Sequence, residues 1–291
     1  MVLKASSDKE IKLKAFLQQR WRISGRLLSD LKKERVIFVN GRRRTVDYRL
    51  RPGDEVIVRL DTEQNTYEGY AYDLEVIYED EHLLVVNKDA HLTVHPTRGS
   101  AEGTLLHAIS YYQSLHHEDY KIRFAHRLDH DTSGVIVIAK NKYAHHQLSE
   151  QFVARTVEKT YWALCHGRTP DTFFIEGDMG RTDSFARTMV DEGKYSRTDF
   201  TRLEGGRDWS LVECRPKTGR THQIRLHLKE AGYPIIGDEL YGRGDGPRHF
   251  LHARAITIDH PVEPERLSFT AELKADMQAL YHSLSQTDPP R

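Results

Sequence analysis

The segment that decides the fold reads Phe124-Ala125-His126-Arg127-Leu128-Asp129-His130-Asp131-Thr132-Ser133-Gly134 and runs directly into Val135-Ile136-Val137-Ile138-Ala139. The second half is a short apolar run rich in β-branched residues, which predicts a buried strand. The first half is polar, and polar groups at the mouth of a buried strand are costly to desolvate unless they are paired or used. An aspartate in such a loop is more often a turn-former, so at this point Asp129 is only a candidate for chemistry.

Short apolar strands dominate the chain from Leu74 onward. We expect them at residues 76–78, 83–86, 135–139 and 161–165. Helices are expected around residues 144–152, where apolar residues recur at four-residue spacing, and from about residue 221 to 230, where Gly232 can end the helix. Many strands without a regular alternation of strand and helix indicate an α+β fold.

The first 60 residues have the features of a small unit of their own. Apolar residues recur there at roughly helical spacing, and Ser24 is placed to cap the second of two short helices. Strand-like runs at 36–39 and 56–58 adjoin the turn signals Asn40-Gly41 and Pro52-Gly53-Asp54. Residues 61–72 are polar without a clear period and predict a linker, which leaves residues 73–291 for a larger domain.

The net charge of zero hides an asymmetry between these two parts. Residues 1–60 carry 16 Lys or Arg and 7 Asp or Glu, and the remainder carries a matching acidic excess. A basic arm on a mildly acidic body favours a polyanionic partner. A solvated charged face would give the same composition, so charge alone leaves both interpretations open.

Length and composition exclude several classes of protein. A chain of 291 residues allows one or two domains with a sizeable core. It has no run of about 18 apolar residues that could span a membrane, and residues 1–5 lack the apolar region of a secretory signal. Cys165 and Cys214 stand in separate apolar stretches without metal-ligand spacing, which indicates reduced core thiols. We expect a cytoplasmic protein and, by default, a monomer.

Three segments together carry a family resemblance. The run from His126 to Gly134 has the pattern His-Arg-Leu-Asp-x-x-Thr-Ser-Gly, and it is followed by Lys159-Thr160-Tyr161-Trp162-Ala163-Leu164. The third segment is Arg215-Pro216-x-Thr218-Gly219-Arg220-Thr221-His222-Gln223-Ile224-Arg225-Leu226-His227, with Pro234-Ile235-x-Gly237-Asp238-x-x-Tyr241-Gly242 close behind. In this order they resemble the RluA-type pseudouridine synthases. The resemblance implies a mixed, mainly antiparallel catalytic sheet and the isomerisation of uridine to pseudouridine in RNA.

That reaction breaks the bond between N1 and C1′, rotates the base and rejoins it through C5. The resemblance implies that Asp129 is the attacking carboxylate and that Arg225 keeps it ionised, since a nearby cation favours the charged form. It also implies that Tyr161 stacks on the uracil and is the candidate base for the C5 proton. Whether the carboxylate adds to C6 or C1′, or promotes loss of a C2′ proton, stays open.

The resemblance also implies a set of substrate-binding residues. Enzymes that act on bases usually flip the nucleotide out of its stack, and Arg127 is the residue expected to fill the vacated space. His126 and Arg220 complete this set, although Arg220 could instead hold its own loop. The family usually has Pro-x-Gly after Asn87-Lys88, and this chain has Asp89-Ala90-His91 instead. This turn is remote in sequence from the run His126 to Gly134, which is the family's central signature. We therefore expect it to change only the local loop shape.

Residues 1–60 resemble an S4-type RNA-binding domain in the runs around Ser24, Asn40-Gly41 and Pro52-Gly53. Such an arm would contact phosphates, which position a protein without reading sequence. The cations expected to do so are Arg26, Lys32, Lys33, Arg35, Arg42, Arg43 and Arg44. The domain arrangement resembles bacterial enzymes that modify large-subunit ribosomal RNA, and other relatives act on transfer RNA.

Two other functions fit part of the pattern. A catalytically inactive S4-type RNA-binding protein would account for the basic arm, but it predicts a broken signature, and the signature here is complete. A hydrolase that uses Asp129 would need a metal-binding carboxylate cluster or a paired general acid, and the sequence shows neither. The sequence therefore favours the isomerase.

The 17 histidines raise the question of a metal site. The densest clusters are His116-His117-Glu118 and His145-His146, but adjacent histidines on a helix point in different directions. HExxH spacing and a Cys/His tetrad are absent. We expect these histidines to lie on the surface. We also expect neither a metal nor a cofactor in the reaction, which has no redox or hydrolytic step.

Overall fold

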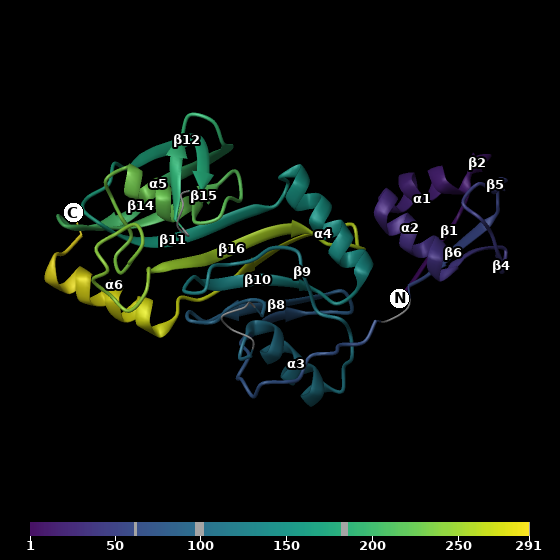
Figure 1. Ribbon diagram of the computed structural model, residues 1–291, viewed down its shortest axis with the longest axis horizontal. Coiled ribbons are helices and arrows are strands. Elements are labelled where there is room, and N and C mark those ends of the chain that lie inside the picture. The colour runs from purple at the N-terminus through teal and green to yellow at the C-terminus, as the bar shows by residue number, and fades with distance from the viewer. Residues whose placement is uncertain (61–62, 97–101, 182–185, 291) are drawn as a thin grey trace.

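The computed structural model describes residues 1–60, 63–96, 102–181 and 186–290 (Figure 1). A small N-terminal unit of two helices and short strands lies at one end, beside helix α4. The rest of the chain forms one large sheet with helices packed around it. No helix among the described residues is long and apolar enough to cross a membrane.

Residues 1–60 build their own apolar core. The helices are α1 (Leu13–Trp21) and α2 (Gly25–Glu34), and a four-stranded sheet runs in the order β1 (Val2–Ser6), β6 (Glu55–Arg59), β3 (Ile37–Val39), β4 (Arg42–Arg43). Strands β2 (Ile11–Lys12) and β5 (Arg49–Leu50) form a separate pair. Ser24 caps α2 by accepting the N–H of Leu27 at 3.2 Å, as predicted. The strand β1 was not predicted, and it pairs with β6 along its whole length.

The N-terminal unit is bound to α4 (Lys142–Ala154) of the larger part. Tyr143 is buried in the apolar core of residues 1–60, and its hydroxyl donates to the carbonyl of Trp21 at 3.1 Å. Gln147 donates to the same carbonyl at 2.9 Å, and Lys142 pairs with Glu34. Because these contacts are buried and polar groups are satisfied across the junction, the arm has a defined place on α4.

The large sheet is mixed and mainly antiparallel, as predicted. Its strand order is β13 (Arg187–Val190), β12 (Thr172–Arg181), β14 (Lys194–Gly205), β15 (Trp209–Pro216), β11 (Glu158–His166), β16 (Leu251–Asp259), β10 (Ser133–Ala139), β8 (Leu83–Lys88), β7 (Val76–Glu79). Strand β17 (Arg266–Thr270) pairs with β16, and β9 (Arg123–Phe124) pairs with β10. The pair β10–β16 is parallel. The expected strands at 76–78, 83–86, 135–139 and 161–165 are all confirmed.

Gly134 fixes how β10 meets β16. Its φ is +112°, and a Cβ at this position would lie 2.3 Å from the carbonyl oxygen of Ala253. Only glycine tolerates both this dihedral and this approach. Strand β10 is buried along its whole length, so the polar residues before it are delivered to a fixed point at the sheet's end. The loop before β10, residues 125–132, is called the signature loop, and its C-terminal end is therefore fixed by a rigid strand.

In the described part of the chain, four helices accompany the sheet: α3 (Leu105–His116), α4, α5 (Gln223–Glu230) and α6 (Ala275–Thr287). The expected helices near 144–152 and 221–230 are α4 and α5. Gly232 follows α5 with a φ of +82° and donates to the carbonyl of Lys229, as a C-terminal glycine should. Helices α3 and α6 were not predicted. Cys165 and Cys214 are free and buried, in agreement with the sequence.

Candidate active site

All six residues proposed for catalysis and base binding line one pocket. Its volume is about 980 Å³. The six are His126, Arg127, Asp129, Tyr161, Arg220 and Arg225. They come from the loop before β10, from β11, from the segment between β15 and α5, and from α5 itself. The structure thus brings together residues that are up to 99 positions apart in the chain.

Asp129 lies beside Arg225 but is not its main partner. One Arg225 guanidinium nitrogen is 3.7 Å from Asp129 Oδ2, and the Asp129 side chain is 24% exposed to the pocket. The same guanidinium makes a bidentate pair with Asp238, with distances of 2.7 and 2.8 Å. Arg225 is therefore held in place by Asp238. The guanidinium nitrogen that does not bond to Asp238 faces Asp129.

Asp238 lies in the run that follows the third segment, from Pro234 to Gly242, and no role was predicted for it. Its side chain is 0% exposed and also accepts the N–H groups of Leu240 and Tyr241, both at 3.0 Å. Burial alone would raise the pKa of Asp238, but the Arg225 hydrogen bonds and charge hold this pKa below its ordinary value. Because two chain segments meet only in the fold, spacing in the sequence did not reveal this pair.

The position of Arg225 is set by the N-terminus of α5, which is fixed by hydrogen bonds of Gln223. Gln223 accepts hydrogen bonds from the hydroxyl of Thr218 at 2.6 Å and from the backbone N–H of Arg220 at 3.0 Å, and it donates to the carbonyl of Arg197. These bonds hold the preceding loop against β14. Arg225 is consequently buried on the first turn of α5 and does not lie on a solvated face.

Tyr161 enters the pocket from an irregular point in β11. The pairing between β11 and β16 shifts register between Thr160 and Tyr161, and such a bulge re-aims a side chain. Burial, together with the nearby charge of Asp129, raises the pKa of Tyr161 above its ordinary value of 10. The phenol is therefore neutral at pH 7 and carries its proton.

His126 has a structural contact within the pocket wall. Its Nε2 accepts the backbone N–H of Val137 at 3.0 Å, and its ring stacks on Phe152 with centroids 5.0 Å apart. Burial, with a smaller effect of Lys159, lowers the pKa of His126 to about 3. The ring is thus neutral at pH 7 and braces β10, while Arg127 beside it is exposed at the pocket.

The pocket has a basic rim that the sequence analysis did not assign. Arg220 donates through Nε to the carbonyl of Tyr195 at 3.0 Å, so it does hold its own segment, as one of the two alternatives expected. Further cations that line the pocket are Arg155, Lys159, Arg215 and Lys217. Such a rim suits a polyanion. The seven cations predicted for the N-terminal arm are all exposed, lie on or directly after α2 and β4, and do not line the pocket.

One expectation about the surface histidines was wrong. His116 and His117 are exposed as expected, but His146 has only 12% of its side chain exposed and lies 2.9 Å from the carbonyl of Arg22 at the junction with the N-terminal unit. The turn at 89–91 is not remote from the signature in space. His91 lies 2.8 Å from Asp131, because the β8–β10 pairing sets Lys88 opposite Gly134.

Comparisons with known proteins agree on one class. A family model described as RNA pseudouridylate synthase matches residues 82–230. An uncharacterized RNA pseudouridine synthase of Bacillus subtilis, YlyB, is 38% identical over 87% of this chain and 86% of its own length. The ribosomal large subunit pseudouridine synthase D of Pseudomonas aeruginosa is 34% identical over 80% of this chain and 79% of its own. Human RNA pseudouridylate synthase domain containing 1 superimposes with a TM-score of 0.60 at 28% identity, covering 78% of this chain and all of that one.

Proposed function

The chain belongs to the RNA pseudouridylate synthase family, and from this premise we propose that Asp129 is the group that attacks the target nucleotide. The enzyme is an isomerase that converts uridine to pseudouridine in RNA. The observation that carries the assignment is the position of Asp129. Its carboxylate is partly exposed to the pocket, and Arg225 lies 3.7 Å away.

The anchoring of Arg225 on Asp238 supports this assignment. A carboxylate bound bidentately by arginine would be a poor nucleophile, because its lone pairs would be engaged. Here the bidentate bonds go to Asp238, so Asp129 has the nearby positive charge without direct capture. This charge would stabilise the negative charge that develops on an expelled uracil.

In this proposal Tyr161 contacts the flipped base, and Arg127 fills the space that the base leaves in the RNA. Tyr161 stacks on the uracil, and its raised pKa disfavours the phenolate that would be needed to abstract the C5 proton. Arg127 is exposed beside Asp129 and can occupy the position left in the RNA stack. A cavity of about 980 Å³ can hold a nucleotide and part of its neighbours.

We propose that the substrate is structured ribosomal RNA. The Pseudomonas aeruginosa relative, which aligns over about four fifths of both chains, is named for the large ribosomal subunit. Unpaired loops are the RNA elements from which a base is most easily flipped. In this proposal residues 1–60 form an S4-type RNA-binding domain, 61–72 a linker and 73–291 the catalytic domain. The enzyme would act in the cytoplasm as a monomer, since one chain supplies the whole proposed site.

Tritium release from C5-labelled uridine tests the proposed substrate. The purified protein is given unmodified large-subunit ribosomal RNA and, separately, unmodified transfer RNA, both transcribed in vitro from the source organism's genes. We expect release from the ribosomal RNA, because C5 must lose its hydrogen when it bonds to C1′. Release from transfer RNA alone would reject the ribosomal assignment, and release from neither would favour a non-catalytic RNA-binding protein.

The basic arm predicts a change in salt dependence. Replacing Arg42, Arg43 and Arg44 together by glutamine should lower the slope of log Kd against log salt concentration by about 2, because single-stranded contacts release about 0.7 counterion each. The measurement is a filter-binding titration on ribosomal RNA at several salt concentrations. The matched control replaces three exposed cations that do not line the pocket, Arg207, Lys229 and Arg266. Equal slopes for the two triple variants would contradict RNA contact by the arm.

A further inference from the structure

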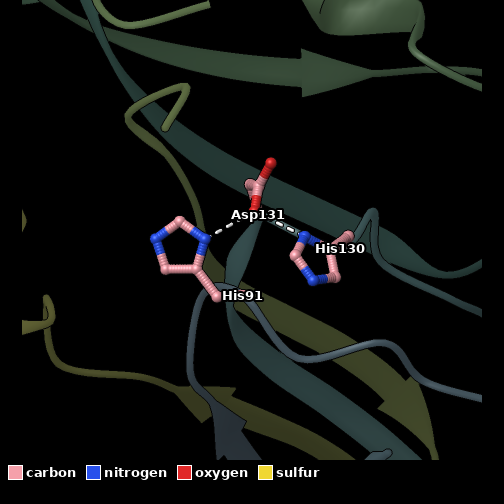
Figure 2. A group of neighbouring side chains, drawn as sticks. All are labelled: His91, His130 and Asp131. Atoms are coloured by element: carbon pink, nitrogen blue, oxygen red, sulfur yellow. Dashed lines mark hydrogen bonds and ion pairs between the residues drawn. The ribbon is translucent and has the colours of Figure 1, made fainter. Parts of the chain in front are cut away.

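Two histidines and an aspartate meet on the outer side of the signature loop (Figure 2). The Nδ1 atoms of His91 and His130 lie 2.8 and 2.6 Å from the same oxygen, Asp131 Oδ1. The two histidine side chains are each 54% exposed and that of Asp131 is 32% exposed, so solvent reaches all three. Within the described part of the chain, this is the one group of three His, Cys, Asp or Glu donors whose ligand atoms all lie within 4.8 Å of one another.

Buried Lys88 holds the two segments together beneath this trio. Its ammonium donates to the carbonyls of Asp89, Leu92 and His130 at 2.7, 2.9 and 3.1 Å. The backbone N–H of Leu92 also donates to the His130 carbonyl. These three hydrogen bonds, from a side chain that is only 1% exposed, fix the turn at 89–92 against the loop at 130–131. The donor set is therefore preorganised.

His91 is one of several non-glycine residues with a positive φ in the described chain, and histidine is among the residue types enriched there. Its φ is +57°, in the left-handed region where glycine is favoured. The histidine is held where its ring reaches Asp131. A strained residue directed into a cluster of donors is a reason to ask what the cluster binds.

We propose that His91, His130 and Asp131 bind one divalent transition-metal ion, with zinc the best fit. Two imidazoles and one carboxylate suit zinc, whereas magnesium and calcium prefer oxygen ligands. Tetrahedral zinc separates its nitrogen and oxygen ligands by about 3.3 Å, so the exposed side chains need only small rotations from their present contacts. Each ring would move its proton to Nε2, and water would take the fourth position.

Such an ion would join the turn at 89–92 to the loop that carries Asp129. It would lie outside the pocket, because none of its three ligands lines the cavity that holds Asp129 and Arg225. Its effect is thus to stiffen the loop, and the chemistry does not pass through it. The inference does not depend on the proposed nucleophile or on the ribosomal substrate.

Zinc titration of the untagged, chelator-stripped full chain tests the site. Calorimetry should show one zinc ion per chain, and thermal unfolding should move to higher temperature with zinc present. His91→Gly removes a ligand and relieves the strained φ, so this variant should fold. We expect its zinc Kd to be weaker by at least the roughly 10–100-fold that loss of even an outer-shell partner costs. Asp131→Asn should weaken binding in the same direction.

The control is His282→Ala, an exposed histidine on α6 that is not part of the trio. It should bind zinc as the wild type does. The proposal is overturned if the wild type binds no zinc, if His91→Gly binds it as tightly as the wild type, or if His282→Ala loses it. Wild-type protein without zinc affinity, combined with weaker RNA binding by His91→Gly, would make the trio an RNA contact instead.

Discussion

Replacing Asp129 by asparagine should lower tritium release from C5-labelled ribosomal RNA by about 10³-fold or more. The amide has nearly the same shape as the carboxylate, but it carries no negative charge and is a poor nucleophile. Among the described residues the Asp129 side chain has one ion pair, the long contact with Arg225 at 3.7 Å, so its replacement should disturb the fold little. RNA affinity, measured by filter binding, should therefore stay close to that of the wild type.

A matched aspartate replacement separates chemistry from general charge loss. Asp171 is 86% exposed and pairs with Arg202, outside the pocket. Asp171→Asn removes the same charge and should release tritium at the wild-type rate. Undiminished release by Asp129→Asn would show that the attacking group lies elsewhere, and the nearest alternative carboxylate in the loop is Asp131. Loss of RNA binding in Asp129→Asn would instead indicate a structural role.

The elements that could be predicted from the sequence are those set by local pattern. Strand β10 is an apolar run that is buried throughout, and Ser24 caps α2 as its place before the apolar residues indicates. The two helices that were missed differ in their signal. In α6, Met277, Leu280, Tyr281 and Leu284 recur at helical spacing, and these side chains form one apolar cluster with Trp209. The sequence therefore contained the pattern that would have predicted this helix. In α3 the mostly apolar run resembles a buried strand as much as a helix.

The pairs that complete the site could not be predicted from spacing. Asp238 meets Arg225 because Asp238 follows a bridge between Ile235 and Cys165, which the chain order alone does not specify. His91 meets Asp131 because antiparallel pairing of β8 with β10 brings distant segments to one end of the sheet. The family resemblance identified the residues expected to act on the base. It did not identify Asp238 as the residue that holds Arg225, because this role depends on which chain segments meet in the fold.

Replacing Asp238 by alanine should be the most damaging single change outside the nucleophile. Arg225 is 7% exposed, and without Asp238 it would retain only Asp129 and the face of Tyr241, 5.2 Å from the ring centre. Removing one partner of a buried pair costs about 3–5 kcal/mol of unfolding free energy. The freed guanidinium should also turn to Asp129 and engage its oxygens, so tritium release should fall by roughly 10²-fold or more in protein that remains folded.

The double variant Asp238→Ala/Arg225→Met separates the two roles of Arg225. Removing both charges leaves no unpaired cation at position 225, so urea unfolding should show a higher free energy of unfolding than in Asp238→Ala alone. Tritium release should not recover, because the pocket has then lost the cation, 3.7 Å from Asp129, that would stabilise the negative charge developing on the departing uracil. Recovery of both stability and activity would contradict the electrostatic role and would mean that Arg225 serves only to satisfy Asp238. Recovery of stability without activity is the outcome that requires the charge of Arg225 in the reaction itself.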